Sequence, residues 1–258
     1  MVLLVVADGV GGAPGGEVAA DAAVNELAQR FFSAGDGRAI EDRLIEGIRD
    51  ANTAVLKAGE SSGFPGAATT LVAAVVQGAR VVVANLGDSR AYLVRAGEAR
   101  QLTDDHHGAF PGGITRFLGD PRGVQPDIFV ETLQPADRLI LCSDGLTRHV
   151  QDAEIAAAMR DDPARAADAL VALARSRGGE DNVTVIVYAA RRPAISRAVA
   201  GTLILALLIL VAVAGAMGAL LATPVPAPAA SASPPASAGP SPSEPASPSV
   251  APSPSAAP

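Results

Sequence analysis

The stretch from residue 68 to residue 103 most constrains the fold, because short β-type runs follow one another there with few residues between them. The runs are ATTLVAAVV, ARVVVANLG, RAYLVRAG and EARQLT, and they are punctuated by the turn signals QG, GDS and AG. Connections of this length are typical of hairpins between neighbouring antiparallel strands. We therefore predict an antiparallel sheet here, and we interpret DIFVETL and DRLILCSDG as a further pair of strands.

Helices and two more strands surround this segment. VLLVVA is interpreted as a first strand buried on both faces, and DNVTVIVYAA as the last strand. Helices are predicted over 17–32, 38–57, 152–159 and 163–175. The first two have apolar residues at helical spacing, which are Ala20, Val24, Leu27 and Phe31, and then Ile40, Leu44, Ile48 and Val55. This order predicts an α+β fold in which two antiparallel sheets pack face to face with helices outside.

The composition divides the chain into zones. Residues 1–190 have the mixed composition of a globular domain, and residues 191–197 form a basic linker with three arginines. Residues 198–222 are uncharged and mostly apolar, and about 20 such residues predict one transmembrane helix. Residues 223–258 consist mainly of Pro, Ala and Ser, which is typical of a disordered tail.

The charges beside the apolar run predict its orientation in the cell membrane. Arginines precede the run and no Lys or Arg follows it, so the positive-inside tendency places residues 1–190 in the cytoplasm and the tail outside the cell. We therefore expect a single-pass membrane protein that contacts the lipid bilayer through residues 198–222.

Charge and cysteine content exclude several classes of protein. The formal net charge is -7, whereas a general nucleic-acid binder presents a basic face, so no nucleic-acid partner is expected. The single cysteine, Cys142, excludes an internal disulfide framework and is expected to be a small core residue. His106, His107 and His149 are interpreted as surface residues, and no cluster of His and Cys suggests zinc.

Four aspartates lie where an apolar strand meets a loop: Asp8, Asp88, Asp144 and Asp181. One Asp beside Gly at a strand end is ordinary turn chemistry. If all four strand ends converge, however, the carboxylates repel one another unless cations lie between them. Hard oxygen ligands select Mg²⁺, Mn²⁺ or Ca²⁺, and a pair of such ions about 4 Å apart suggests metal-assisted hydrolysis.

Six motifs follow one another over residues 2–188: VVADGVGGAPGGEVAA, GAATTLVAAVV, VANLGDSRAYLVRAGEARQLTDDH, ITRFLG, DRLILCSDGL and GGEDNVTVIV. In this order they resemble the PPM family, the protein phosphatase 2C type of Ser/Thr phosphatases, and its bacterial, membrane-anchored members in particular. The resemblance implies an αββα sandwich. It also implies hydrolysis of phosphoserine and phosphothreonine by a water that bridges two Mn²⁺ or Mg²⁺ ions. The implied partners are phosphorylated proteins, among them a Ser/Thr kinase.

The resemblance also implies a role for each acidic residue. Asp8 would bridge the two ions, and Gly9 would add its backbone carbonyl to one of them. Asp144 and Asp181 would hold the other ion, so that Asp8, Asp144 and Asp181 form the catalytic centre. Asp88 would join Asp144 at a third ion.

The sequence departs from the family pattern in three places. Members of the family have one or two strands before the one that ends at Asp8, with an Arg that binds phosphate and a short Asn/acidic motif. Here Met1 falls within that strand, so we expect an N-terminally incomplete domain with weak or no turnover. The segment between LTDDHH and GGITRFLG is short, which alters the substrate groove. Val10 stands where some members have a proton-donating His.

Three functions are consistent with these features. The first is a membrane-anchored, metal-dependent Ser/Thr protein phosphatase. The second is a pseudophosphatase that binds phosphoproteins as a regulatory module without turnover. The third is a tethered structural protein whose exported Pro/Ser-rich tail is the working part.

Overall fold

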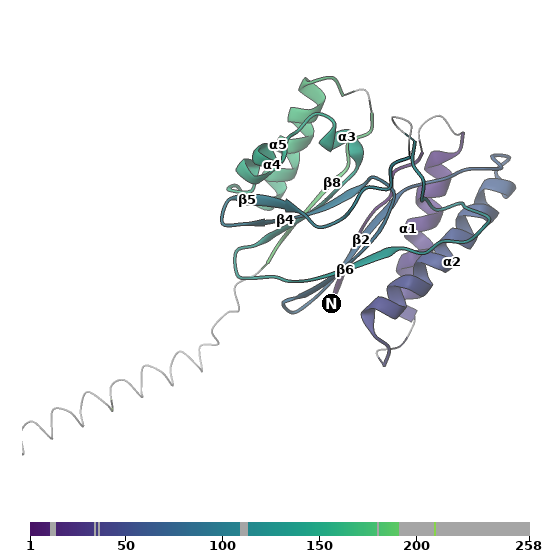
Figure 1. Ribbon diagram of the computed structural model, residues 1–258, viewed down its shortest axis with the longest axis horizontal. Coiled ribbons are helices and arrows are strands. Elements are labelled where there is room, and N and C mark those ends of the chain that lie inside the picture. Colours follow the sequence, from purple (N-terminus) through teal and green to yellow (C-terminus); the bar gives the residue numbers. More distant parts are fainter. Residues whose placement is uncertain are drawn as a thin grey trace, which may run out of the picture. The chain divides into compact units, whose positions relative to one another are not determined.

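The computed structural model describes residues 1–10, 14–33, 35, 37–108, 113–179, 181–190 and 209. This part of the chain forms eight strands and five helices, whose arrangement can be followed in Figure 1. The strands are β1 (Val2–Val6), β2 (Leu71–Gln77), β3 (Arg80–Leu86), β4 (Arg90–Arg95), β5 (Glu98–Gln101), β6 (Asp127–Thr132), β7 (Arg138–Cys142) and β8 (Val185–Ala189). The helices are α1 (Gly16–Ser33), α2 (Ile40–Ser61), α3 (Asp144–Thr147), α4 (Asp152–Ala158) and α5 (Pro163–Ser176).

The strands form two four-stranded antiparallel sheets, in the orders β1-β2-β3-β6 and β5-β4-β7-β8. Because side chains alternate along a strand, each sheet presents one apolar row to each neighbouring layer. In β2, Val72 and Ala74 pack between the sheets, whereas Leu71 and Ala73 face the helices α1 and α2. The α+β prediction of two antiparallel sheets with helices is confirmed.

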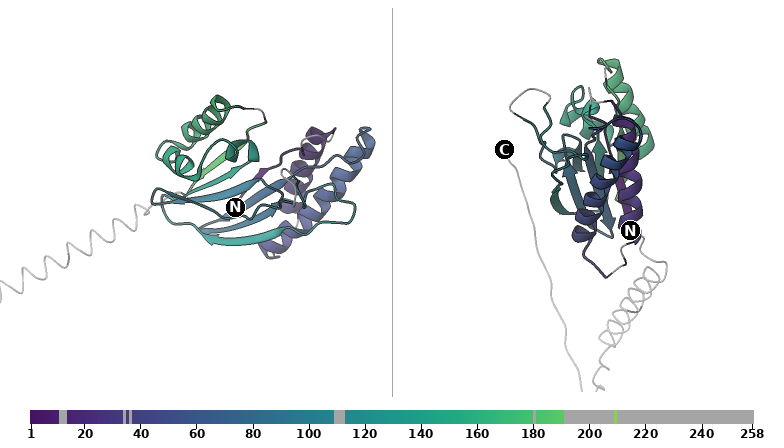
Figure 2. Two further views of the ribbon diagram at one scale, coloured as in Figure 1. Left: turned by 45° about the horizontal axis from the view of Figure 1, so that its top comes forward. Right: turned by 90° about the vertical axis from the view of Figure 1, so that its right-hand side faces the viewer.

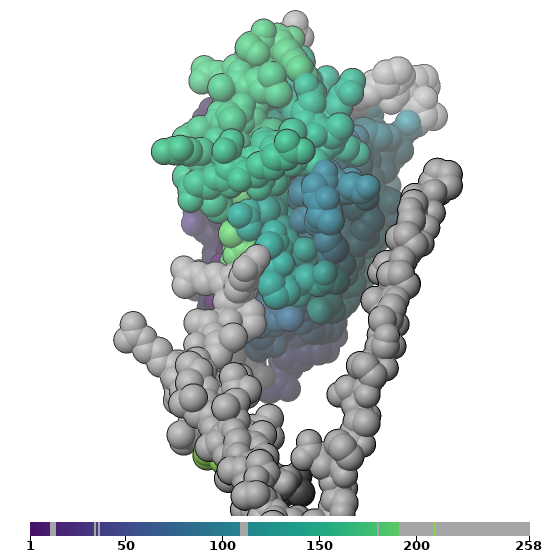
Figure 3. Space-filling view, turned by 90° about the vertical axis from the view of Figure 1, so that its left-hand side faces the viewer, coloured from purple at the N-terminus to yellow at the C-terminus, as the bar shows by residue number. Residues whose placement is uncertain are grey.

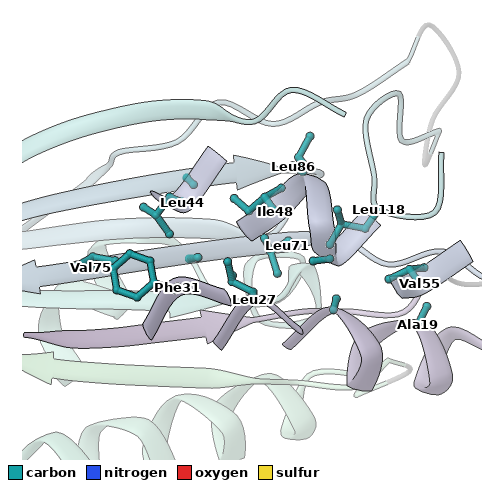
Figure 4. Close-up of a cluster of buried hydrophobic side chains, with 14 of the residues drawn as sticks. Ala19, Leu27, Phe31, Leu44, Ile48, Val55, Leu71, Val75, Leu86 and Leu118 are labelled. Carbon is teal, nitrogen blue, oxygen red and sulfur yellow. The ribbon is translucent and has the colours of Figure 1, made fainter. Parts of the chain in front are cut away.

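Helices cover the outer face of each sheet (Figures 1 and 2). Figure 4 shows the packing of α1 and α2 on the first sheet, where Leu27, Phe31, Leu44 and Ile48 meet strand residues such as Leu71. On the other side, α4 and α5 cover the second sheet. Figure 3 shows that side, with the green helices beside the blue β4–β5 hairpin.

The predicted apolar face is correct for α2 and partly wrong for α1. All four residues predicted for α2 are buried. In α1 the buried residues are Ala19, Ala23, Leu27 and Phe31, so the predicted face is wrong by one position in its first half. Alanine is so frequent there that two adjacent helical rows are equally apolar, and the neighbouring helix decides which row is buried.

Two strand pairings were predicted wrongly. β6 pairs with β3 and β7 pairs with β4 and β8, so the predicted β6–β7 pair does not form. The GDS turn likewise joins β3 to β4 across the two sheets and is not a hairpin. A short connection can join two strands of one sheet or lead from one sheet to the other, and its length alone does not predict which of the two occurs. β1 is an edge strand and is half-buried, which contradicts the predicted burial on both faces.

The C-terminal zones were predicted as a linker (191–197), a transmembrane helix (198–222) and a tail (223–258). They lie outside the described residues, apart from Ile209. Among the residues that the structure describes, no helix combines the length and the apolar character needed to cross a bilayer. Cys142 is fully buried in the core beneath α4 and α5, as predicted.

Candidate active site

The four predicted aspartates line one cavity of about 240 Å³ at the ends of β1, β3 and β7 and before β8. The full lining consists of Asp8, Gly9, Val10, Thr70, Asp88, Ile114, Asp144, Arg148 and Asp181. The carboxylates differ in exposure, because Asp88 is buried whereas the side chain of Asp181 is 41% exposed. The predicted site residues, including Gly9, therefore come together in one place from distant parts of the chain.

Thr70 connects the loop of Asp8 to the loop of Asp88. Its hydroxyl oxygen accepts a hydrogen bond from the Asp8 N–H (3.2 Å) and lies 2.8 Å from the Ser89 hydroxyl. Its own N–H donates to the Asp8 carbonyl (2.8 Å). Thr70 is buried, so these bonds fix both loops relative to each other. The sequence analysis missed this residue, although the TT pair directly before β2 marks its place.

Gly9 is required by the close approach of helix α1. A Cβ atom at this position would lie 2.7 Å from the Cα of Gly16, which is closer than carbon atoms can pack. The Asp8 carbonyl is held further by the Thr69 hydroxyl, which donates to it at 2.9 Å. These contacts fix the backbone at Asp8 and Gly9, where the Asp8 side chain lines the cavity.

The loops that carry Asp144 and Asp181 are bonded to each other. The Ser143 hydroxyl donates to the carbonyl of Asn182 (3.1 Å) and accepts from the Thr184 N–H (3.1 Å). A Cβ at Gly145 would lie 2.4 Å from the Asn182 carbonyl oxygen, so only glycine permits this contact. Asp144 begins the short helix α3, which the sequence analysis did not predict.

His106 holds the turn before Asp88, and its interpretation as a surface residue is wrong. Its side chain is buried, and its Nδ1 accepts a hydrogen bond from the Gly87 N–H (3.0 Å). The His106 N–H in turn donates to the Gly87 carbonyl (3.0 Å). Its Nε2 lies 2.9 Å from the Asp127 carboxylate and 2.9 Å from the Arg116 guanidinium.

The convergence of the carboxylates changes their proton affinity. Burial, and after it the negative charges of Asp144, Asp181 and Asp88 in that order, together raise the pKa of Asp8 from 3.8 to about 7. Burial and the charge of Asp144 also raise the pKa of Asp88. The cavity therefore holds more negative charge than its surroundings neutralise, which favours a bound cation.

Arg148 supplies positive charge at this cavity. Its guanidinium forms an ion pair with Asp144, and Nη1 lies 3.5 Å from a carboxylate oxygen of Asp181. In the described part of the chain, no three His, Cys, Asp or Glu side chains are close enough to form a ready-made metal cage. The carboxylates therefore face one space without yet converging on one point.

The family model described as protein phosphatase 2C matches residues 1–178. The chain belongs to the protein phosphatase 2C family. It is 36% identical over 209 residues to the serine/threonine phosphatase stp of Listeria innocua, covering 72% of this chain and 83% of that one. The protein is accordingly a metal-dependent Ser/Thr protein phosphatase, as predicted.

Solved structures of the protein phosphatase 2C family share this fold. The crystal structure of the Mycobacterium tuberculosis phosphatase PstP/Ppp is similar with a TM-score of 0.67 and 33% identity, over 74% of this chain and 88% of that one. The PstP catalytic domain in complex with two manganese ions gives a TM-score of 0.64 and 35% identity, over 72% and 86%. That relative binds a pair of divalent ions of the kind predicted here.

Proposed function

We propose that this phosphatase removes phosphate from phosphoserine and phosphothreonine at the cavity of the four aspartates, with divalent cations held by their carboxylates. The observation that carries the proposal is the meeting of four carboxylates in about 240 Å³, with a pKa of about 7 at Asp8. Carboxylate and carbonyl oxygens suit Mn²⁺ or Mg²⁺ and not zinc. The donor set therefore fits the ions that the family implies.

Each ligand has a proposed place. Asp8, the Gly9 carbonyl, Asp144 and Asp181 would hold two ions, and Asp88 would join Asp144 at a third. Support comes from the loops themselves, because Thr70 and Ser143 fix them in pairs through hydrogen bonds that do not use the carboxylates.

The chain's own residues shape the reaction around the ions. Bound divalent ions lower the pKa of a water and neutralise charge on the phosphate. The water oxygen attacks phosphorus while the bond to the Ser or Thr oxygen breaks, and the products are a free hydroxyl and inorganic phosphate. Val10 and Ile114 give the cavity an apolar wall, and neither side chain can donate a proton.

Mn²⁺-dependent release of phosphate from a phosphothreonine peptide tests the proposal. The Asp144→Asn variant removes one ligand charge from an otherwise unchanged cavity and is expected to lose hydrolysis by at least about a hundredfold while still folding. Asp168→Asn removes the same charge from the exposed face of α5 and serves as the matched control. Phosphopeptide binding without turnover in the parent chain would instead select the pseudophosphatase, and Asp144→Asn turnover equal to the parent's would refute the assignment of the site.

We also propose that residues 198–222 anchor the phosphatase domain to the cytoplasmic face of the cell membrane, with residues 223–258 outside. The arginines of 191–197 and the uncharged apolar run support this topology. A membrane-bound Ser/Thr kinase would then be a reachable substrate. Protease treatment of intact cells tests the topology, because it should shorten the chain at its C-terminus and spare the domain. Full protection, or release of the chain in the soluble fraction, would refute it.

A further inference from the structure

A second cavity adjoins the site and shares three residues with it. This cavity of about 390 Å³ is lined by Asp88, Arg90, Asp105, His107, Asp144, Thr147 and Arg148. Asp88, Asp144 and Arg148 also line the cavity of the four aspartates. Arg148 therefore lies at the boundary between the proposed metal ligands and an open space large enough for a phosphorylated side chain.

Two arginines line the second cavity, and they differ in how firmly they are held. Arg90 donates to both carboxylate oxygens of Asp105 at 2.7–3.0 Å and to the Tyr92 hydroxyl at 3.0 Å. Its guanidinium is therefore committed within the fold. The Arg148 side chain is 56% exposed, and its ion pairs are those with Asp144 and Asp181.

Divalent ions at this site would change the surroundings of Arg148. They would neutralise Asp144 and Asp181, and a cation on a carboxylate repels a guanidinium beside it. Arg148 directly follows α3 and caps its C-terminus, four residues after Asp144, so its backbone stays beside the site. Its long side chain can then turn toward the second cavity without a change in the fold.

We propose that Arg148 is the phosphate-binding cation of this enzyme: it pairs with Asp144 and Asp181 in the metal-free chain and binds the phosphoryl oxygens of the substrate once divalent ions occupy those carboxylates. This inference rests on the proposed function. A guanidinium presents parallel N–H donors that match two oxygens of a phosphate, which an ammonium does not. Arg148, at the C-terminal end of α3, would thereby be the cation that binds the phosphate beside the ions.

The proposal predicts that removing the Arg148 guanidinium has opposite effects on the affinity for Mn²⁺ and on the affinity for phosphate. In the metal-free chain Arg148 competes with the ions for carboxylates, so its removal should strengthen Mn²⁺ binding. In the Mn²⁺-loaded chain it binds phosphate, so its removal should weaken phosphate binding. A residue that merely neutralises the acidic cluster would change the first quantity and leave the second unchanged.

Isothermal titration calorimetry of the full-length chain, with MnCl₂ and then with inorganic phosphate, tests the proposal independently of turnover. Arg148→Gln is expected to bind Mn²⁺ about threefold to tenfold more tightly and phosphate about tenfold to a hundredfold more weakly than the parent. Arg148→Lys should recover part of the phosphate affinity, because it keeps the charge and loses the fork. Arg165→Gln, an exposed α5 residue outside both cavities, should leave both affinities unchanged.

Peptide hydrolysis separates failure of this inference from failure of the proposed function. If the parent hydrolyses phosphopeptide, Arg148→Gln is expected to raise KM by about tenfold or more. Unchanged phosphate affinity and KM in Arg148→Gln would overturn the role of Arg148 and leave the phosphatase assignment standing. If the parent showed no hydrolysis, the proposed function would fail, and the phosphate titration would still decide for or against Arg148.

Discussion

Replacing Asp8 by Asn is expected to stabilise the metal-free protein at alkaline pH. In the folded chain the pKa of Asp8 is raised from 3.8 to about 7 by burial and by three neighbouring aspartates. A raised carboxyl pKa contributes stability below pH 3.8 that is lost as the pH rises through about 7, since the folded state then has to hold the charge. Asparagine is similar in shape and carries no charge at any pH.

The size of the effect follows from the two pKa values. A difference of about 3 pH units corresponds to about 4 kcal/mol, and because Asp8 is half-buried, solvent screening reduces this to about 2 kcal/mol at pH 8. At pH 4.5 the unfolded carboxyl is mostly ionised, but this pH lies only about 0.7 units above its pKa of 3.8, so the gain is about 1 kcal/mol before screening and about 0.5 kcal/mol after it. For a domain of this size, 2 kcal/mol raises Tm by about 4–8 °C.

Thermal unfolding followed by circular dichroism in the presence of EDTA measures this gain. Asp8→Asn should melt higher than the parent at pH 8 and nearly together with it at pH 4.5. Asp168→Asn, which removes an exposed charge from α5, should match the parent at both values. Equal melting of Asp8→Asn and the parent at pH 8, or an equal gain at both pH values, would refute the claim that burial and the neighbouring carboxylates disfavour the charged form of Asp8.

Three further substitutions test how the loops are held. His106→Ala should lower the free energy of unfolding by about 1–3 kcal/mol in urea titrations, because the Gly87 N–H loses its acceptor; unchanged stability would contradict the bond. Thr70→Val removes the hydroxyl between two site loops and should cost a similar amount and weaken Mn²⁺ binding in calorimetry, whereas parental Mn²⁺ affinity would show that the hydroxyl does not position the site. Gly145→Ala places a methyl group against the carbonyl of Asn182 and should cost about 1–3 kcal/mol and reduce phosphate release, and a fully active variant would argue against the close contact.

The sequence contained enough information for the layers and for the acidic residues of the site. Nearly continuous apolar runs in β2 and β3 specify two buried faces, and a strand buried on both faces requires layers on both sides. Asp8 and Asp144 follow apolar strands directly, so their place at the sheet edge could be read from the chain.

The remaining features depend on tertiary contacts. The GDS turn has a length that suits a hairpin, but the strands on its two sides, β3 and β4, pair with strands of different sheets. His106 has an ordinary loop sequence around it, and its burial depends on Gly87, which is distant in the chain. Helix α3 is too short for apolar periodicity, so the approach of Arg148 to Asp144 had no sequence signal beyond a spacing of four residues.

The central claim is that carboxylates from distant segments meet in order to hold divalent cations. The number of Mn²⁺ ions bound per chain, measured by calorimetry of the full-length protein at pH 8, tests this claim most directly. At least two ions are expected for the parent, with loss of at least one in Asp8→Asn. A parent chain that binds no Mn²⁺, or an Asp8→Asn variant that binds as many ions with the same affinity, would contradict it.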